Sequence, residues 1–263
     1  MKGKLGTVVN ALVVLAALLL VWQGLIWGLG IKPFMLPSPW RVASTVVTRF
    51  SSLWASFLIT AEAAAGGLAA SIVVGTMVAL VFAQSRWLRK MLLPYTILLQ
   101  TVPIIAVAPL IIMWVGAGLF AVTLITFIIC LAPIIANTTQ GLISVDENMV
   151  NLFLMQNASA GQVLLKLRLP HALPEMFTGI RIASGISVIG AITGELFAGS
   201  SSVGQGGLGY SINYAQAQMQ TDYLFALVFA ATILGFAFFF VVMFLEYYFL
   251  HEWHESARNV EGQ

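Results

Sequence analysis

Long apolar runs separated by short polar breaks occupy most of the chain. A helix needs about 20 mostly apolar residues to cross the roughly 30 Å of hydrocarbon in a bilayer. Runs of about this length predict membrane-spanning helices near residues 5–29, 53–83, 91–115, 119–136, 176–198 and 224–250. We therefore expect an all-α membrane protein with about six transmembrane helices.

The first apolar run begins like a secretory signal peptide, because Lys2 and Lys4 precede it. It continues to residue 29 without a small-residue cleavage site, so we expect a retained span. The prolines of IKPFMLPSPW then break the pattern. Residues 1–52 are thus predicted to form the first span and an outer linker, residues 53–250 the core, and residues 251–263 a polar tail.

Composition supports a bilayer environment and excludes several other classes of protein. The 263 residues are 60% hydrophobic and 8% charged, with a mean hydropathy of +0.96, whereas soluble domains carry about 25% charged residues. The net charge of +2 does not suggest nucleic-acid binding. Cys130 is the only cysteine, which excludes an internal disulfide and a Cys-rich metal site, and we expect no metal site.

The distribution of basic residues predicts the orientation, because these residues concentrate on the cytoplasmic side of a membrane protein. With six spans, both termini share one side. That side holds Lys2, Lys4, Arg86, Arg89, Lys90, Lys166, Arg168 and Arg258. The other side holds Lys32, Arg41 and Arg49. We therefore expect both termini, the turn at 84–90 and the polar stretch at 137–175 to be cytoplasmic.

A first short helix is predicted inside the polar stretch. Residues 145–156 read VDENMVNLFLMQ and place Asp146 and Glu147 in a first helical turn, where acidic side chains are favourable. Apolar positions at helical spacing follow at Met149, Leu152 and Phe153. The alternative to an ordered helix here is a solvated loop.

A second short helix follows a turn near Asn157. Residues 159–168 read SAGQVLLKLR, and one face of the predicted helix carries Val163, Leu164 and Leu167. Pro170 and Pro174 should then stop the helix before the fifth span. Two short helices joined by a turn would form a docking surface, which we place at residues 146–175.

One set of residues in this stretch has a characteristic spacing: Asn151-Leu152-Phe153, Asn157, Leu167 and Leu169-Pro170. The spacing resembles the cytoplasmic signature of the permease subunits of bacterial ABC importers. That signature reads E-A-A, three residues, G, nine residues, I, one residue, L-P. The segments LRLPHALPEMFTGIRIASG, PYTILLQTVPIIAVAPLIIMWVGAGL, GELFAG and GGLGY are similar to the branch that serves nitrate, sulfonates, taurine, and pyrimidine or riboflavin-type vitamin precursors.

The resemblance implies a type I (MetI-like) permease fold with a cytoplasmic coupling helix, in the bacterial inner (plasma) membrane. It implies that the chain is not an enzyme and holds no cofactor, since ATP and Mg would bind a partner ATPase. The implied partners are two ATPase subunits, an extracytoplasmic substrate-binding protein and a second permease copy. The implied ATPase-coupling residues are Asn151, Leu152, Phe153, Asn157, Leu164, Leu167, Arg168, Leu169 and Pro170.

Two residues depart from the family signature. Asn151 replaces its Glu, which removes one charge that could pair with the ATPase. Asn157 replaces its Gly at the turn between the short helices. Asn is the next most tolerant residue for positive φ, so we expect the turn to form.

Polar residues inside the predicted spans are candidates for the transport path. Charges there cost several kcal/mol unless they are paired or hydrated, and we single out Glu62, Arg181 and Glu195. Each has two interpretations, a structural ion pair or hydrogen bond, and a place in the path or gate. By resemblance, Glu at position 62 favours an uncharged or cationic heterocycle over an anion. Further candidates are Gln100 and Thr101, beside Pro103, and Thr193.

The source of energy distinguishes the possible functions. The chain has no G-x-x-x-x-G-K-[ST] phosphate loop, so energy must come from a partner or from an ion gradient. An ATP-driven importer is therefore weighed against a self-contained ion-coupled secondary transporter and against a membrane scaffold or sensor. Secondary transporters often contain inverted repeats, and we find no clear internal repeat.

Overall fold

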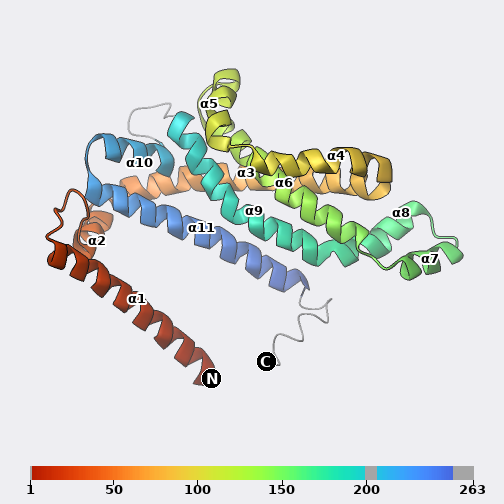
Figure 1. Ribbon diagram of the computed structural model, residues 1–263, viewed down its shortest axis with the longest axis horizontal. Helices are drawn as coiled ribbons and strands as arrows, with labels where there is room; N and C mark the ends of the chain where they lie inside the picture. The colour runs from red at the N-terminus through yellow and green to blue at the C-terminus, as the bar shows by residue number, and fades with distance from the viewer. Residues whose placement is uncertain (1, 199–205, 251–263) are drawn as a thin grey trace.

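The computed structural model describes residues 2–198 and 206–250, and this part of the chain is helical and contains no strand (Figure 1). The predicted tail at 251–263 lies outside it. The helices are α1 (Lys2–Leu29), α2 (Pro39–Thr48), α3 (Phe50–Gln84), α4 (Arg86–Leu98), α5 (Ile104–Val115), α6 (Leu119–Ile143), α7 (Glu147–Met155), α8 (Ala160–Val163), α9 (Leu169–Ala198), α10 (Leu208–Ala217) and α11 (Thr221–Leu250). A 3₁₀ turn, Leu99–Thr101, follows α4, and a π-helical turn, Leu164–Arg168, joins α8 to α9.

Among the residues that the structure describes, four helices are long and apolar enough to cross a membrane: α3, α6, the continuous helix 160–198 and α11. The pair formed by residues 86–101 and α5 gives a fifth if it is one span, although it is bent by 99°. Helix α1 covers the predicted first span at 5–29 and contains an apolar helical segment at Ala16–Leu29. The predicted count of six therefore stays a prediction.

The bend in the predicted third span lies at Pro103. Val102 has extended backbone (φ −68°, ψ 121°), and Pro103 precedes the first residue of α5. Proline disfavours the helical conformation in the residue before it, which explains the break. Pro94 and Pro109, in contrast, lie inside α4 and α5. The sequence predicted a single span here, and the structure has two helices.

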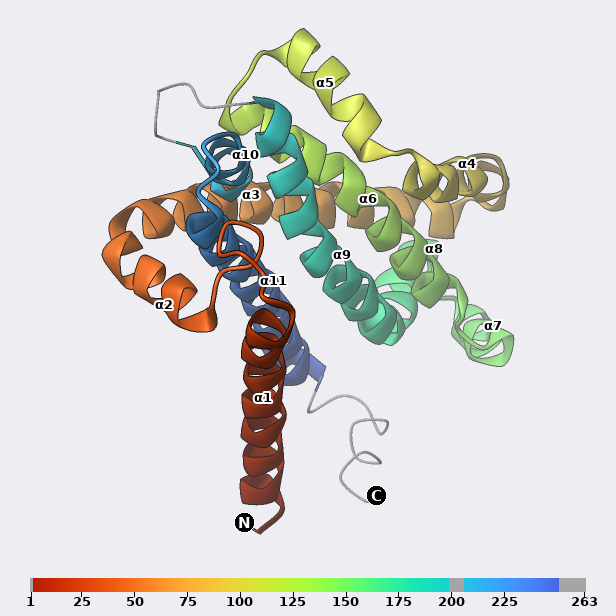
Figure 2. The same ribbon diagram turned by 60° about the vertical axis from the view of Figure 1, so that its left-hand side comes forward.

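The centre of the bundle is α6, which packs against both α3 and α9 (Figure 2). Small residues allow this close approach. A Cβ at Gly67 of α3 would overlap Thr126 of α6, and a Cβ at Gly190 of α9 would press on Ile129. Membrane helices commonly associate through such small residues, because the backbones can then come close together.

The prediction that Pro170 and Pro174 stop the helix before the fifth span is wrong. Helix α9 begins at Leu169, contains both prolines and continues to Ala198. A proline loses its own backbone hydrogen bond and clashes with the carbonyl group four residues earlier. The π turn at Leu164–Arg168 ends one residue before Leu169-Pro170 and includes Lys166, whose carbonyl group would otherwise clash with Pro170. Helix α6 likewise continues to Ile143, beyond the predicted end at 136.

The two ends of the bundle differ. Helices α7 and α8 lie at one end, and α2 and α10 lie at the other (Figures 1 and 2). We call them the α7 end and the α10 end. Helix α1 diverges from the bundle, and Trp22 in its apolar part packs against Phe225 and Phe229 of α11 with ring centroids 5.9 Å apart.

Candidate functional site

The first predicted short helix is present as α7, whereas the second, α8, continues through the π turn into α9. We call the predicted segment 146–175 the coupling element. Asp146 caps α7, because its carboxylate accepts a hydrogen bond from the amide of Asn148 at 2.7 Å. Ser159 caps α8 through a reciprocal pair of hydrogen bonds with Gln162. These caps satisfy helix-terminal amides that would otherwise lack partners. Asp146 and Ser159 therefore explain why α7 and α8 begin where they do.

Asn157 makes the turn between α7 and α8. Its φ of +56° lies in the left-handed region. Gly and Asn tolerate this conformation best, as expected from the sequence. The amide of Ala158 donates to the carbonyl oxygen of Phe153 at 3.0 Å and closes the turn. Asn at the signature Gly position is therefore compatible with the turn.

The α7 face of the coupling element is apolar and exposed. Met155 is 82% exposed and Leu152 is 50% exposed, although both are large apolar side chains. Asn151 and Asn157 are also exposed, whereas Phe153 is half-buried. Further exposed apolar side chains of the element are Met149, Leu154 and Leu165. A cluster of this kind at one end of the bundle is typical of a surface that binds another protein.

The other face of the coupling element packs on the bundle. Leu164 and Leu169 contact a buried cluster formed by Ala79, Ala83, Leu142 and Ala172. The Arg168 guanidinium donates to the carbonyl oxygen of Ala83 near the end of α3, at 3.1 Å. Leu167 and Pro170 are half-buried. The predicted coupling residues therefore fall on two faces, one exposed and one attached to α3, α6 and α9.

Glu195 lies in a buried polar cluster at the α10 end, and it is 3% exposed. Its carboxylate accepts hydrogen bonds from the Thr60 hydroxyl of α3 at 2.9 Å and from the Gly209 amide at 2.8 Å. Thr60 in turn accepts from the Leu208 amide at 2.7 Å. Because these amides belong to the first turn of α10, the carboxylate lies at the positive end of that helix. We call these four residues the Glu195 cluster.

The glycines after α9 allow this cluster to form. A Cβ at Gly207 would overlap the Glu195 carboxylate, and a Cβ at Gly209 would overlap the carbonyl oxygen of Ile192. Gly207 and Gly209 of the sequence GGLGY are therefore required for close packing around the Glu195 carboxylate.

Glu62 is placed differently from Glu195. It is exposed on α3 and makes no hydrogen bond or ion pair within the described ranges 2–198 and 206–250. It follows Thr60 by two residues, so it lies close to the level of the Glu195 cluster but on another face of α3. Gln100 and Thr101 are exposed at the bend between α4 and α5, and Thr193 is buried in α9.

An ion pair joins two spans nearer the α7 end. Arg181 of α9 pairs with Glu246 of α11, and Phe177 stacks on Phe249 beside it. Arg181 thus forms a structural ion pair, which was one of the two interpretations given for it. Glu246 was not among the charged residues singled out from the sequence, although a carboxylate inside an otherwise apolar run was a usable signal. Among the described residues, no group of three His, Cys, Asp or Glu side chains could hold a metal ion.

Comparison with known proteins identifies the family. Residues 71–253 match the family described as "Binding-protein-dependent transport system inner membrane component". A probable ABC transporter permease protein of Haemophilus influenzae is 35% identical over 216 residues, which cover 82% of this chain and 86% of that protein. The riboflavin transport system permease protein RibX of Chloroflexus aurantiacus is 35% identical over 215 residues, which cover 81% and 78%.

The formylaminopyrimidine transport permease protein ThiX of Halalkalibacterium halodurans is 31% identical over 219 residues, which cover 83% of this chain and 85% of that protein. The predicted all-α class and the family resemblance are thus confirmed. The chain belongs to the family of inner-membrane components of binding-protein-dependent transport systems, the multi-pass permease subunits of ABC importers.

Proposed function

We propose that this chain is the permease of an importer in which two copies line a path and two ATPase subunits bind at the α7 end. ATP and Mg²⁺ would bind to those subunits. A substrate-binding protein would deliver a small organic solute at the α10 end. The α7 end would then be cytoplasmic, together with both termini, as the distribution of basic residues favours.

The observation that carries this proposal is the two-faced structure of the coupling element. Its α7 face presents Leu152 and Met155 to solvent, where an ATPase groove could bury them. Burying a large apolar side chain contributes about 1.5–3 kcal/mol, so a few such residues supply a useful part of the binding free energy.

The inner face would transmit movement of the ATPase into the bundle. Leu164 packs between α3, α6 and α9, and the Arg168 guanidinium binds a carbonyl oxygen near the end of α3. A displacement of the element would therefore pull on α3, which carries Glu62 and Thr60 farther along the same helix. Movement as a rigid unit requires this kind of attachment, because a loosely held element would move without the span.

We infer an uncharged or cationic heterocycle as the substrate class. Glu62 supports this inference, because it is a carboxylate without a partner in the described residues and lies on an exposed face of a span. An intramembrane carboxylate is costly unless water, a partner or a substrate reaches it. Two relatives carry names that refer to riboflavin and to formylaminopyrimidine. Gln100 and Thr101 are further candidates for the path, whereas the hydrogen bonds of Glu195 favour a structural role for it.

Substitution of Leu152 tests the docking proposal. Leu152→Asp should abolish co-purification of the ATPase, because it places a charge where an apolar side chain would be buried. Gln156→Asp is the matched control, since it adds the same charge to an exposed polar position at the end of the same helix. We expect the control to retain the ATPase. Normal co-purification and uptake with Leu152→Asp would refute the assignment of this face.

A further inference from the structure

A pocket of about 590 Å³, lined by both charged and apolar side chains, lies at the α10 end. Three segments form its walls: the linker before α2, helix α2 itself, and the turn from α10 into α11. We call it the Arg49 pocket, and its lining includes Phe34, Arg41, Arg49, Met219, Asp222 and Tyr223. Its volume falls within the range of about 300–1,000 Å³ that is common for binding pockets.

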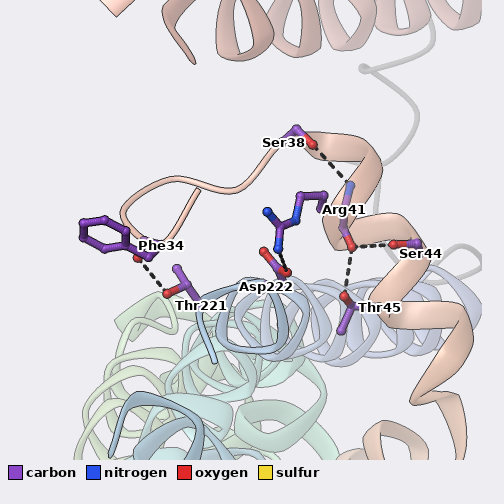
Figure 3. Close-up of polar contacts among 7 residues, drawn as sticks. All are labelled: Phe34, Ser38, Arg41, Ser44, Thr45, Thr221 and Asp222. Atoms are coloured by element: carbon purple, nitrogen blue, oxygen red, sulfur yellow. Dashed lines mark hydrogen bonds and ion pairs between the residues drawn. The ribbon is translucent and has the colours of Figure 1, made fainter. Parts of the chain in front are cut away.

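The charges in the Arg49 pocket do not balance. Arg41 forms an ion pair with Asp222 at 2.8 Å (Figure 3). Arg49 instead donates to the neutral amide oxygen of Gln220, and its guanidinium lies 4.9 Å from the centre of the Tyr223 ring. No carboxylate in residues 2–198 and 206–250 pairs with Arg49. The pocket therefore holds one cation whose charge is not neutralised.

The walls of the pocket are held in place by bonds between the three segments. The Thr221 hydroxyl donates to the carbonyl oxygen of Phe34 at 2.8 Å, which fixes the linker to the start of α11 (Figure 3). Arg41 reaches from α2 to Asp222, and Arg49 reaches from the end of α2 to Gln220. A site that is already ordered loses little conformational entropy on binding.

Met219 stands at the rim in an unfavourable backbone conformation. It follows α10 with a φ of +54°, at the position where a helix usually ends in glycine. A residue with a Cβ costs roughly 1–2 kcal/mol there, yet this Met side chain is 87% exposed. Phe34, also at the pocket, is 64% exposed. Exposed Met and aromatic residues around an Arg have the composition of the centre of a protein interface.

We propose that the Arg49 pocket receives an Asp or Glu side chain of the extracytoplasmic substrate-binding protein. The Arg49 guanidinium would bind the carboxylate through two parallel hydrogen bonds, and Met219 would cover the contact. The site suits a protein that arrives from water, because the linker and α2 lie outside the predicted spans. This inference rests on the proposed importer function and locates one of its partners.

The test measures how the substrate-binding protein stimulates ATP hydrolysis by the whole importer in nanodiscs. Arg49→Glu should raise the concentration needed for half-maximal stimulation by at least about tenfold, as loss of a central interface arginine does. Arg49→Gln should give a smaller shift in the same direction. Lys32→Glu is the matched control, because Lys32 is an exposed cation on the linker before α2 but does not line the pocket.

Two further measurements decide whether the ligand of Arg49 is an acidic residue of the binding protein. Replacing one acidic surface residue of the binding protein by Arg should restore stimulation of the Arg49→Glu importer. Equal stimulation of the Arg49→Glu and unchanged importers would overturn the proposal. So would a defect that occurs only in nanodiscs with anionic phosphatidylglycerol and vanishes in phosphatidylcholine, because a lipid phosphate would then be the ligand. An importer that shows no ATP hydrolysis with any binding protein would contradict the proposed function itself.

Discussion

Replacement of Glu195 should detach α10 from the bundle locally. The Glu195→Ala variant removes the acceptor of two buried hydrogen bonds, from the Thr60 hydroxyl and the Gly209 amide. Hydrogen bonds to a charged group contribute about 1.5–3 kcal/mol each. The loss is therefore about 3–6 kcal/mol of local stability, if both bonds are lost and the amide of Gly209 finds no new partner.

Hydrogen exchange measures this loss where it occurs. An energy of 3 kcal/mol corresponds to a factor of roughly 100 or more in an equilibrium constant, so amides in residues 206–217 should exchange about 100-fold faster. The Glu195→Gln variant should exchange less than tenfold faster. Its amide oxygen can accept from Gly209, and its amide group can donate to Thr60, whose hydroxyl has the carbonyl oxygen of Ser56 at 3.1 Å as a second acceptor.

Glu62→Ala is the control for this experiment. It removes the same chemical group from α3, near the level of Thr60, but Glu62 is exposed and has no partner in the described residues. Exchange in residues 206–217 should stay within about twofold of the unchanged protein. The reasoning fails if Glu195→Ala exchanges like the unchanged protein, or if Glu62→Ala accelerates exchange just as much.

The remaining predictions concern the turn of the coupling element and the transport path. Asn157→Ala should destabilise the turn by roughly 1 kcal/mol, because alanine tolerates φ of +56° less well. Asn157→Gly should be close to neutral. Thermal melting of the assembled importer would show the difference, and equal melting temperatures for the two variants would contradict the prediction. Glu62→Gln should weaken uptake of a cationic substrate more than ATP hydrolysis, whereas equal losses in uptake and hydrolysis would argue for a structural role.

Features that depend on neighbouring residues were accessible from the sequence. The apolar runs predicted α3, α6 and α11, because a bilayer span imposes a local requirement on composition. Gly116 and Gly118, between α5 and α6, have φ of +85° and +123°, conformations that glycine adopts readily. The caps of the coupling element are likewise local.

Features that depend on contacts between distant residues could not be predicted from the sequence. The partner of Glu195 is Thr60, 135 positions earlier, and no local pattern indicates that contact. Glu246 was visible as a carboxylate inside an apolar run, but its pairing with Arg181 of another span was not indicated by any local pattern. Pro170 and Pro174 misled the prediction, because a local rule about proline did not anticipate the π turn that precedes them.

Purification of this subunit from its native host in mild detergent tests the central claim most directly. The account predicts that an ABC ATPase co-purifies in equal amount, as mass spectrometry of the complex would show, and that Leu152→Asp removes it. A chain that purifies as a stable protein without an ATPase would contradict the account. It would instead favour an ion-coupled transporter, with Glu62 as the first residue to test.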